Sequence, residues 1–156
     1  MQLRWQVTVP WILAVGSFTS AARQVSSSPA FGAAAVVVPD NLRLVSRLAL
    51  DIFASTHNFF ALHLVTGAHA YRLLYPFAGE ERDAIFTLGI LCGYAAVGAP
   101  VFVHHDSPEF SGPVSWLNLI RDDEHDAKLA YSADDQSRHW GDPAYRRIAA
   151  DYLDSR

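Results

Sequence analysis

The chain has 156 residues, of which 51% are hydrophobic and 18% charged, and its formal net charge is −4. This length and apolar content suffice for the core of one domain and leave little room for a second. The low charge provides no basic surface for a phosphate backbone, so nucleic acid is excluded as a partner. The single cysteine, Cys92, excludes an internal disulfide and a cysteine-based zinc site.

Residues 1–22 have two interpretations. Arg4 near the start, an apolar centre and small residues at the end of this segment resemble a secretory signal. Pro10 within the apolar centre and the scarcity of positive charge favour a retained segment of a cytoplasmic protein. The apolar run is shorter than the ~20 residues of a membrane span. We therefore expect a cytoplasmic protein without a membrane span; a secreted protein is the alternative if residues 1–22 are a signal peptide.

Residues 24–41 are rich in serine, proline and small side chains and show no helical period. The segment AAAVVVP, residues 33–39, has the composition of a short strand, but no second strand is predicted that could pair with it. We therefore predict that residues 1–41 form an irregular N-terminal segment and that residues 42–156 form a helical domain.

The first helix of this domain follows Asp40 or Asn41, and residues 56–58 form the turn before a second helix that ends at Leu74. Residues spaced three and four apart on the second helix form one mostly apolar face: Phe59, Leu62, His63, Thr66, Ala70 and Leu73. This spacing predicts that His63 is buried with a hydrogen-bonded ring nitrogen. A histidine in this position is more often a core residue than a ligand or a catalyst.

The next helix begins near Glu80 and runs to Gly98, and its later part carries almost no charge. It is apolar on all sides, so more than one of its faces must be buried against other helices. So few helices are predicted that we expect self-association or a partner chain to bury the rest. Its glycines are expected to allow a close helix contact. A proline-rich break with two adjacent histidines, His104 and His105, then follows, and we expect these histidines to be exposed.

A long helix is predicted from Val114 to Trp140, with Ile120, Asp123 and Ala127 in one row. A last short helix begins at Pro143 after a capping aspartate, Asp142. The sequence therefore predicts an all-α fold of about five helices, irregular in arrangement and part of a larger helical fold.

Residues 122–128, DDEHDAK, carry four acids around a histidine. Such a cluster is usually a solvated helix face, and Glu124 and Lys128 have the spacing of a stabilising surface pair. The alternative is functional. His125 and Lys128 lie one turn apart, and Asp122 precedes the histidine by three residues, so a carboxylate could orient an imidazole beside a cation. Such a trio can hold an anionic oxygen or transfer a proton.

Several common chemistries lack their motifs in this sequence. It has no glycine-rich dinucleotide motif after a strand, no P-loop, no G-x-S-x-G elbow and no H-E-x-x-H. The Glu-x-x-His pairs that hold metals inside helical bundles are also missing, so no metal ligands are predicted.

Two segments together resemble the questin oxidase-like family. Residues 58–100 resemble a family stretch in which a Phe-Phe pair precedes a histidine and Val-Thr on a helix. Residues 121–142 resemble the family's later Asp-Glu-His-x-x-Lys helix. The resemblance covers residues 42–145, and because family members are longer, it implies that this chain corresponds to their C-terminal part. Named fungal members are similar to enzymes that cleave anthraquinone or related polyketide rings by Baeyer–Villiger oxidation with NADPH and molecular oxygen.

The resemblance implies roles for particular residues. The positions that match the family's recurrent residues are Phe60, His63, Thr66, Asp123, Glu124, His125 and Lys128. It implies that His63, His125 and Lys128 are catalytic, that Phe60, Thr66 and Asp123 bind a small aromatic or polyketide-like substrate, and that NADPH is the cofactor. We then expect His63 and His125 to converge between two packed helices, with Asp122 or Asp123 orienting one imidazole.

A function of another class is also open. Half of a fold would expose the apolar face that its missing half covers, so the chain could be a non-catalytic helical module that associates with a partner chain.

Overall fold

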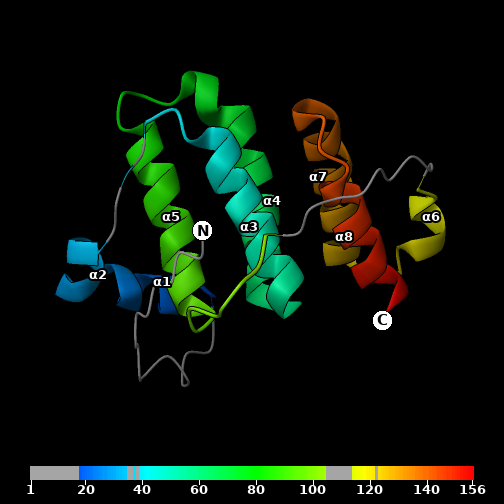
Figure 1. Ribbon diagram of the computed structural model, residues 1–156, viewed down its shortest axis with the longest axis horizontal. Helices are drawn as coiled ribbons and strands as arrows, with labels where there is room; N and C mark the ends of the chain where they lie inside the picture. The colour runs from blue at the N-terminus through cyan, green and yellow to red at the C-terminus, as the bar shows by residue number, and fades with distance from the viewer. Residues whose placement is uncertain (1–17, 35–36, 38, 105–113, 122) are drawn as a thin grey trace.

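The computed structural model describes residues 18–34, 37, 39–104, 114–121 and 123–156. These residues form helices and turns, and none of them lies in a strand, which confirms the predicted all-α fold (Figure 1). The elements are α1 Phe18–Ser26, α2 Pro29–Ala34, α3 Leu42–Thr56, α4 Phe59–Leu74, the 3-10 turn η1 Tyr75–Phe77, α5 Arg82–Ala96, α6 Trp116–Leu119, α7 Glu124–Trp140 and α8 Ala144–Asp154.

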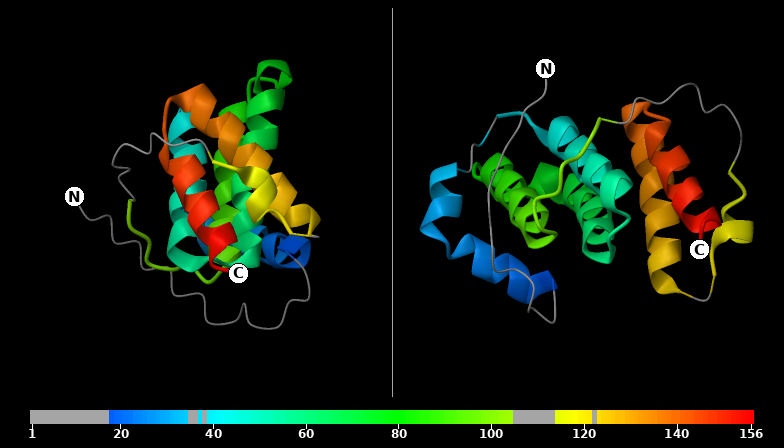
Figure 2. Two further views of the ribbon diagram at one scale, coloured as in Figure 1. Left: turned by 90° about the vertical axis from the view of Figure 1, so that its right-hand side faces the viewer. Right: turned by 60° about the horizontal axis from the view of Figure 1, so that its bottom comes forward.

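Helix α4 lies at the centre of the arrangement and packs against α3, α5 and α7. Helix α8 covers α7, and α1 lies against α5 on the other side of the molecule (Figures 1 and 2). The main hydrophobic core is built from α3, α4, α5, α7 and α8, and Phe53, Leu62, Leu129 and Tyr145 are among its fully buried side chains. The helices that carry the resemblance, α4, α5 and α7, therefore share one core.

The turn between α3 and α4 forms where the sequence predicts it. His57 ends α3 in the left-handed conformation, with φ 47°, and its amide donates to the carbonyl of Phe53. Asn58 begins α4, and its side-chain oxygen accepts a hydrogen bond of 2.7 Å from the amide of Phe60. Two neighbouring residues thus end one helix and cap the next, which makes α3 and α4 an antiparallel hairpin.

The predicted buried face of α4 is wrong. Its buried residues are Ala61, Leu62, Leu64, Val65, Ala68 and His69. Phe59 and Leu73, which we placed on the inner face, are about half exposed, and His63 is only partly buried. Three helices contact α4, so burial extends over more than one stripe and its centre is rotated away from the face expected for a helix with one neighbour.

The single helix predicted from Val114 to Trp140 is also wrong. Helix α6 ends at Leu119, Ile120 is extended, and α7 begins only after Asp123, whose side chain accepts a hydrogen bond from the amide of His125. Asp123 therefore caps a new helix and does not share a helical row with Ile120, and Ala127 is exposed. An aspartate that bonds to the backbone in this way favours a helix start over a helix interior.

The segment predicted to be irregular contains two helices, α1 and α2, and no strand among its described residues. Val25 of α1 is buried against Cys92 and Ala95 of α5, and Pro29 occupies the first position of α2, where a missing amide hydrogen has no cost. These long-range contacts outweigh the weak local pattern. They also mean that the chain itself covers a second face of α5. Burial raises the pKa of the Cys92 thiol, as expected for an unreactive cysteine.

The proposed close approach at the glycines of α5 does not occur at Gly89, where an added Cβ would meet no neighbouring atom within 4 Å. None of the helices that the structure describes is both long and apolar enough to cross a membrane. The signal-peptide interpretation concerns residues 1–22, most of which lie outside the described residues.

Replacing the capping residue of α4 tests the local account of the α3–α4 turn. Asn58→Ala removes the side-chain acceptor for the amide of Phe60 and should lower the free energy of unfolding by about 1 kcal/mol, measured by urea denaturation. Asn58→Asp keeps an acceptor and should retain most of the stability. Equal stability of the alanine variant and the wild type would contradict the cap.

Candidate functional site

The predicted histidines meet at the first turns of α4 and α7. Residues later in α4 contact residues later in α7: His63 lies against His125, His69 bonds to Ser132, and Arg72 bonds to Gln136. The two helices are therefore parallel, and their N-terminal ends lie at the same end of the molecule (Figure 1). This parallel register places the two segments of the resemblance side by side.

Three aromatic rings form the centre of this site. The ring centroids of His63 and His125 are 5.5 Å apart. Phe59 contacts both in edge-to-face geometry, with centroid distances of 4.7 Å to His63 and 4.8 Å to His125. The two imidazoles thus converge as predicted, although they lie at the rim of the core, with the His125 side chain 25% exposed.

Hydrogen bonds fix the tautomers of both histidines. The Nδ1 of His63 lies 2.9 Å from the carbonyl oxygen of Phe59, and the Nδ1 of His125 lies 2.9 Å from a carboxylate oxygen of Asp123. Carbonyl and carboxylate oxygens only accept, so each Nδ1 carries the hydrogen. The remaining nitrogen, Nε2, is then the one that takes up or releases a proton on each imidazole.

Asp123 both caps α7 and orients His125. The same oxygen accepts from the amide and the imidazole of His125, and the other oxygen lies 3.5 Å from the guanidinium of Arg156. The backbone hydrogen bond from His125, followed by the imidazole hydrogen bond, lowers the pKa of Asp123. Asp123 therefore stays ionised and holds the ring of His125 through Nδ1. Asp122, the other expected orienting residue, lies outside the described residues.

Among the described contacts, none joins Lys128 to the three rings. Its ammonium pairs with Glu124 at 3.1 Å, and both side chains are mostly exposed. Glu124 also lies 4.0 Å from the Nε2 of His125, so a carboxylate stands between the cation and the imidazole. This arrangement matches the surface-pair interpretation of the DDEHDAK segment for these two residues.

The two residues implied to bind substrate on α4 are placed differently from each other. Thr66 directs its hydroxyl to backbone carbonyls of its own helix, Leu62 at 3.4 Å and His63 at 3.5 Å. Phe60 contacts Phe59, with a centroid distance of 6.2 Å, while Phe59 is the ring that touches both histidines. The sequence carried a signal for Phe59, which is one turn before His63 on the same face.

A second polar cluster, which the sequence analysis missed, lies further along the same two helices. His69 is only 5% exposed, its Nε2 lies 3.0 Å from Asp135, and its Nδ1 accepts from Ser132 at 3.3 Å. Arg72 bonds to the same Asp135 oxygen and donates to Gln136 at 2.8 Å. We name these five residues the His69 network. Neither His69 nor Arg72 has a partner nearby in sequence, which is why only the structure reveals the network.

The His69 network is a structural link between α4 and α7. Desolvation raises the pKa of Asp135, but the hydrogen bond from His69 and the charge of Arg72 outweigh it, so the pKa lies below the ordinary value. The ring of His69 can donate from Nε2 to Asp135 and accept at Nδ1 from Ser132 at the same time. The Ser132 hydroxyl is buried inside a helix contact, where no substrate reaches it.

The remaining described histidines serve other contacts. His57 packs against Phe53 and Tyr152, and His104 bonds through Nδ1 to Asp51 at 2.8 Å, although its side chain is exposed as predicted. His105 lies outside the described residues. Among the described residues, no group of three or more histidine, cysteine, aspartate or glutamate side chains is arranged to hold a metal ion.

No protein-family model, curated protein or solved structure matches this chain.

The lowered pKa of Asp123 gives a pH-dependent stability. Its ionised form stabilises the fold, so this contribution is complete above the ordinary aspartate pKa of about 4 and is lost as the pH falls through the lower folded-state value. Asp123→Asn keeps a capping oxygen without the charge. The stability difference between wild type and this variant, measured by denaturation from pH 2.5 to 6, should be present at pH 6. It should decrease toward zero as the pH falls below about 4. A difference that stays constant would contradict the role of the charge.

The His69 network predicts unequal effects for two carboxylate substitutions on α7. Asp135→Asn leaves the guanidinium of Arg72, whose side chain is 9% exposed, without a carboxylate and should lower the free energy of unfolding by about 1–3 kcal/mol. Glu124→Gln breaks the exposed pair with Lys128 and should cost less than about 1 kcal/mol. Urea denaturation of both variants measures the contrast, and equal losses would show that the network does not fix the α4–α7 contact.

Proposed function

We propose that His63 and His125 form the acid–base site of a questin oxidase-like oxidoreductase that acts on the ketone of a polyketide or quinone-like ring. The observation that supports this proposal is the meeting of the two imidazoles, from separate helices, at a centroid distance of 5.5 Å, with Nδ1 of each already bonded. Two histidines held in one tautomer beside each other are a suitable pair for accepting and returning a proton.

The proposed reaction requires a group that stabilises a negatively charged oxygen and a group that supplies a proton. In a Baeyer–Villiger step a peroxide derived from molecular oxygen adds to the ring ketone, the carbonyl oxygen gains charge, and a protonated Nε2 can bind that oxygen by a charge-assisted hydrogen bond. A ring carbon then migrates to the peroxide oxygen as the O–O bond breaks, and the departing oxygen takes up a proton, so the product gains one oxygen atom. We assign the role of proton donor to His125, whose ring is held through Nδ1 by the carboxylate of Asp123. We assign the role of base to His63, whose Nδ1 donates to the backbone carbonyl of Phe59.

Phe59 provides a surface for the substrate ring. Its side chain is 50% exposed and touches both imidazoles, so an aromatic substrate that packs on it lies beside the proton-exchanging nitrogens. In this proposal Phe59 takes the role expected of Phe60, which acts as its neighbour. The Thr66 hydroxyl bonds to the backbone of its own helix. Lys128 is connected to the site through its ion pair with Glu124, whose carboxylate lies 4.0 Å from the Nε2 of His125.

The described residues around the histidines do not form a dinucleotide site. The cations that contact the acidic groups here are Lys128 and Arg156, and both are paired with carboxylates: Lys128 with Glu124, and Arg156 with Asp123 and Asp126. They are therefore engaged and do not present charge to the phosphates of NADPH. NADPH stays a prediction of the resemblance: it would supply the electrons that reduce oxygen, and the residue roles given above are argued without it.

The proposal is tested by conversion and by binding. The purified chain is incubated with a hydroxyanthraquinone, NADPH and oxygen, and mass spectrometry follows the gain of one oxygen atom by the product. His63→Ala and His125→Ala should each lower turnover on the order of a hundredfold or more, because the group that meets the developing charge is lost. NMR of the histidine ring protons, recorded while the hydroxyanthraquinone is added, measures binding independently of turnover.

His57→Asn is the matched control, since it changes a histidine that packs on Phe53 and Tyr152 and keeps a residue type that tolerates the left-handed conformation. It should leave both conversion and binding unchanged. If the wild-type chain neither converts the hydroxyanthraquinone nor shifts the His63 and His125 ring signals, the proposed function is wrong for this chain.

A second candidate function is association with another chain as a non-catalytic helical module. Three apolar side chains near the end of α4 favour it, because Leu73, Leu74 and Phe77 are 49%, 61% and 85% exposed. Apolar groups gathered on one segment are typical of protein contacts.

Self-association through this segment is directly measurable. Light scattering of the wild-type chain should show a mass that rises with concentration, and Phe77→Glu should abolish the rise by placing a charge in the contact. Leu117→Glu, which changes an equally exposed residue of α6, is the control and should leave the mass unchanged. A monomer at all concentrations would exclude self-association by this segment.

A further inference from the structure

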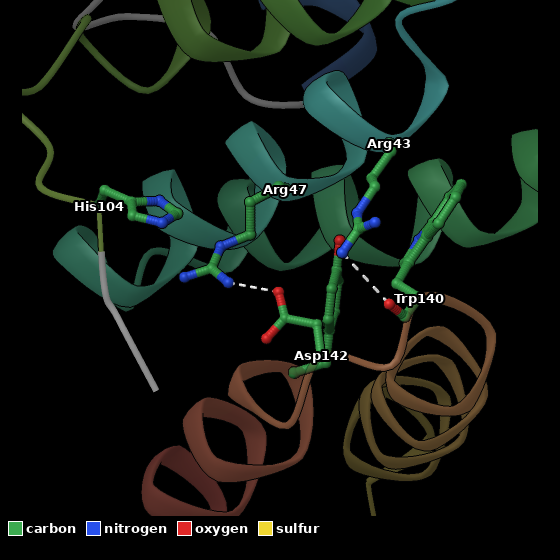
Figure 3. A pocket seen from close by; sticks show the side chains of 6 residues that line it. Arg43, Arg47, His104, Trp140 and Asp142 are labelled. Carbon is green, nitrogen blue, oxygen red and sulfur yellow. Dashed lines mark hydrogen bonds and ion pairs between the residues drawn. The ribbon is translucent and has the colours of Figure 1, made fainter. Parts of the chain in front are cut away.

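A pocket of about 200 Å³ lies away from the histidine pair, where α3 meets the end of α7 and the start of α8. It is lined by Arg43, Arg47, His104, Trp140, Asp142 and Tyr145. Figure 3 shows the two arginines reaching down from α3 toward Asp142 and Trp140, with His104 beside Arg47 at the other end of the row. The volume is below the roughly 300–1,000 Å³ of sites for drug-sized ligands, so the pocket suits a smaller molecule.

The two arginines of the pocket are in different electrostatic states. Arg47 is neutralised, because its guanidinium pairs with Asp51 at 3.2 Å and with Asp142 (Figure 3). Arg43 donates to the backbone carbonyl of Trp140 at 3.3 Å and lies 6.0 Å from the centroid of its ring. Within the described part of the chain, Arg43 makes no ion pair with a carboxylate. The pocket therefore has a positioned cation whose charge is not balanced by direct pairing.

Tyr145 adds a donor that the protein does not use. Its side chain is 1% exposed, and its hydroxyl has no hydrogen-bond partner among the described residues. Burial, together with the charge of Asp142, raises the pKa of this phenol, so it remains a neutral O–H donor. A buried hydroxyl without a partner destabilises a fold, and an acceptor oxygen entering the pocket would remove that cost.

We propose that this pocket binds a small organic acid, with the carboxylate directed to Arg43 and Tyr145 and an apolar or aromatic body beside Trp140. A guanidinium and a phenol together match a carboxylate, because both can donate hydrogen bonds to its oxygens and the guanidinium carries the opposite charge. The indole of Trp140 is held by Arg43 above and by a hydrogen bond from its Nε1 to Gln136 at 3.0 Å, so it offers a fixed flat surface. The ligand site is separate from the histidine pair and does not depend on its chemistry.

Calorimetric titration of the full chain with benzoate tests this proposal. Benzoate should bind saturably at millimolar or lower concentration. Benzamide, which has the same shape without the charge, should bind at least tenfold more weakly, because it leaves the guanidinium of Arg43 without its anion. Inorganic phosphate provides the other anion class. Phosphate binding tighter than benzoate binding would overturn the assignment to an organic acid.

Two variants locate the binding. Arg43→Gln and Tyr145→Phe should each weaken benzoate about fivefold or more, and Arg138→Gln, which changes an exposed arginine paired with Asp134, should not. Tyr145→Phe removes a hydroxyl that has no protein partner, so its stability in urea should equal or exceed that of the wild type. Benzoate that fails to bind, or that binds both variants as tightly as the wild type, would overturn the proposal. A Tyr145→Phe variant that is less stable would also overturn it, since the hydroxyl would then be satisfied within the protein.

Discussion

The contact between α4 and α7 is the interaction on which the candidate site depends. Along most contacts of this fold apolar side chains meet, and their attraction is not directional. The His69 network does not tolerate a slide of one helix along the other, because a shift would separate Arg72 and His69 from Asp135 and leave buried polar groups without partners. The network therefore fixes the parallel register of the two helices, and that register places His63 against His125 one to two turns away.

Local signals explain which parts of the fold were predictable. The turn at residues 56–58 and the start of α8 are set by capping groups within two or three residues. The turn occurs as predicted, whereas α8 begins at Ala144, one residue later than predicted, with Pro143 before it and Asp142 accepting from the amide of Ala144. The buried face of α4 was mispredicted because it is decided by three neighbouring helices that the local pattern does not contain. Helix α1 escaped prediction for the same reason, since Val25 is buried against Cys92 and Ala95 of α5, which lie far along the chain.

The candidate site was predictable in part. The convergence of His63 and His125 followed from treating two separate segments as one resemblance, whereas spacing within either segment says nothing about the other. That Asp123 orients His125 was one of the two expected alternatives. Its capping role and the contact of Phe59 with His125 depend on where α7 begins, and the assumption of one continuous helix from Val114 hid that start. The organic-acid pocket was beyond sequence reasoning, because its lining residues come from α3, a loop, the end of α7 and the start of α8.

The same helix relates the two proposed sites. His125 lies in the first turn of α7 and Trp140 is its last residue, a separation of 15 residues, or about 22 Å along the helix axis at 1.5 Å per residue. The His69 network lies between them and ties the middle of α7 to α4. A ligand at one end could influence the other only by moving α7 as a body, and that movement would break buried hydrogen bonds that have no alternative partners. The two sites should therefore act independently, so that benzoate at Arg43 leaves the ring signals of His63 and His125 in place.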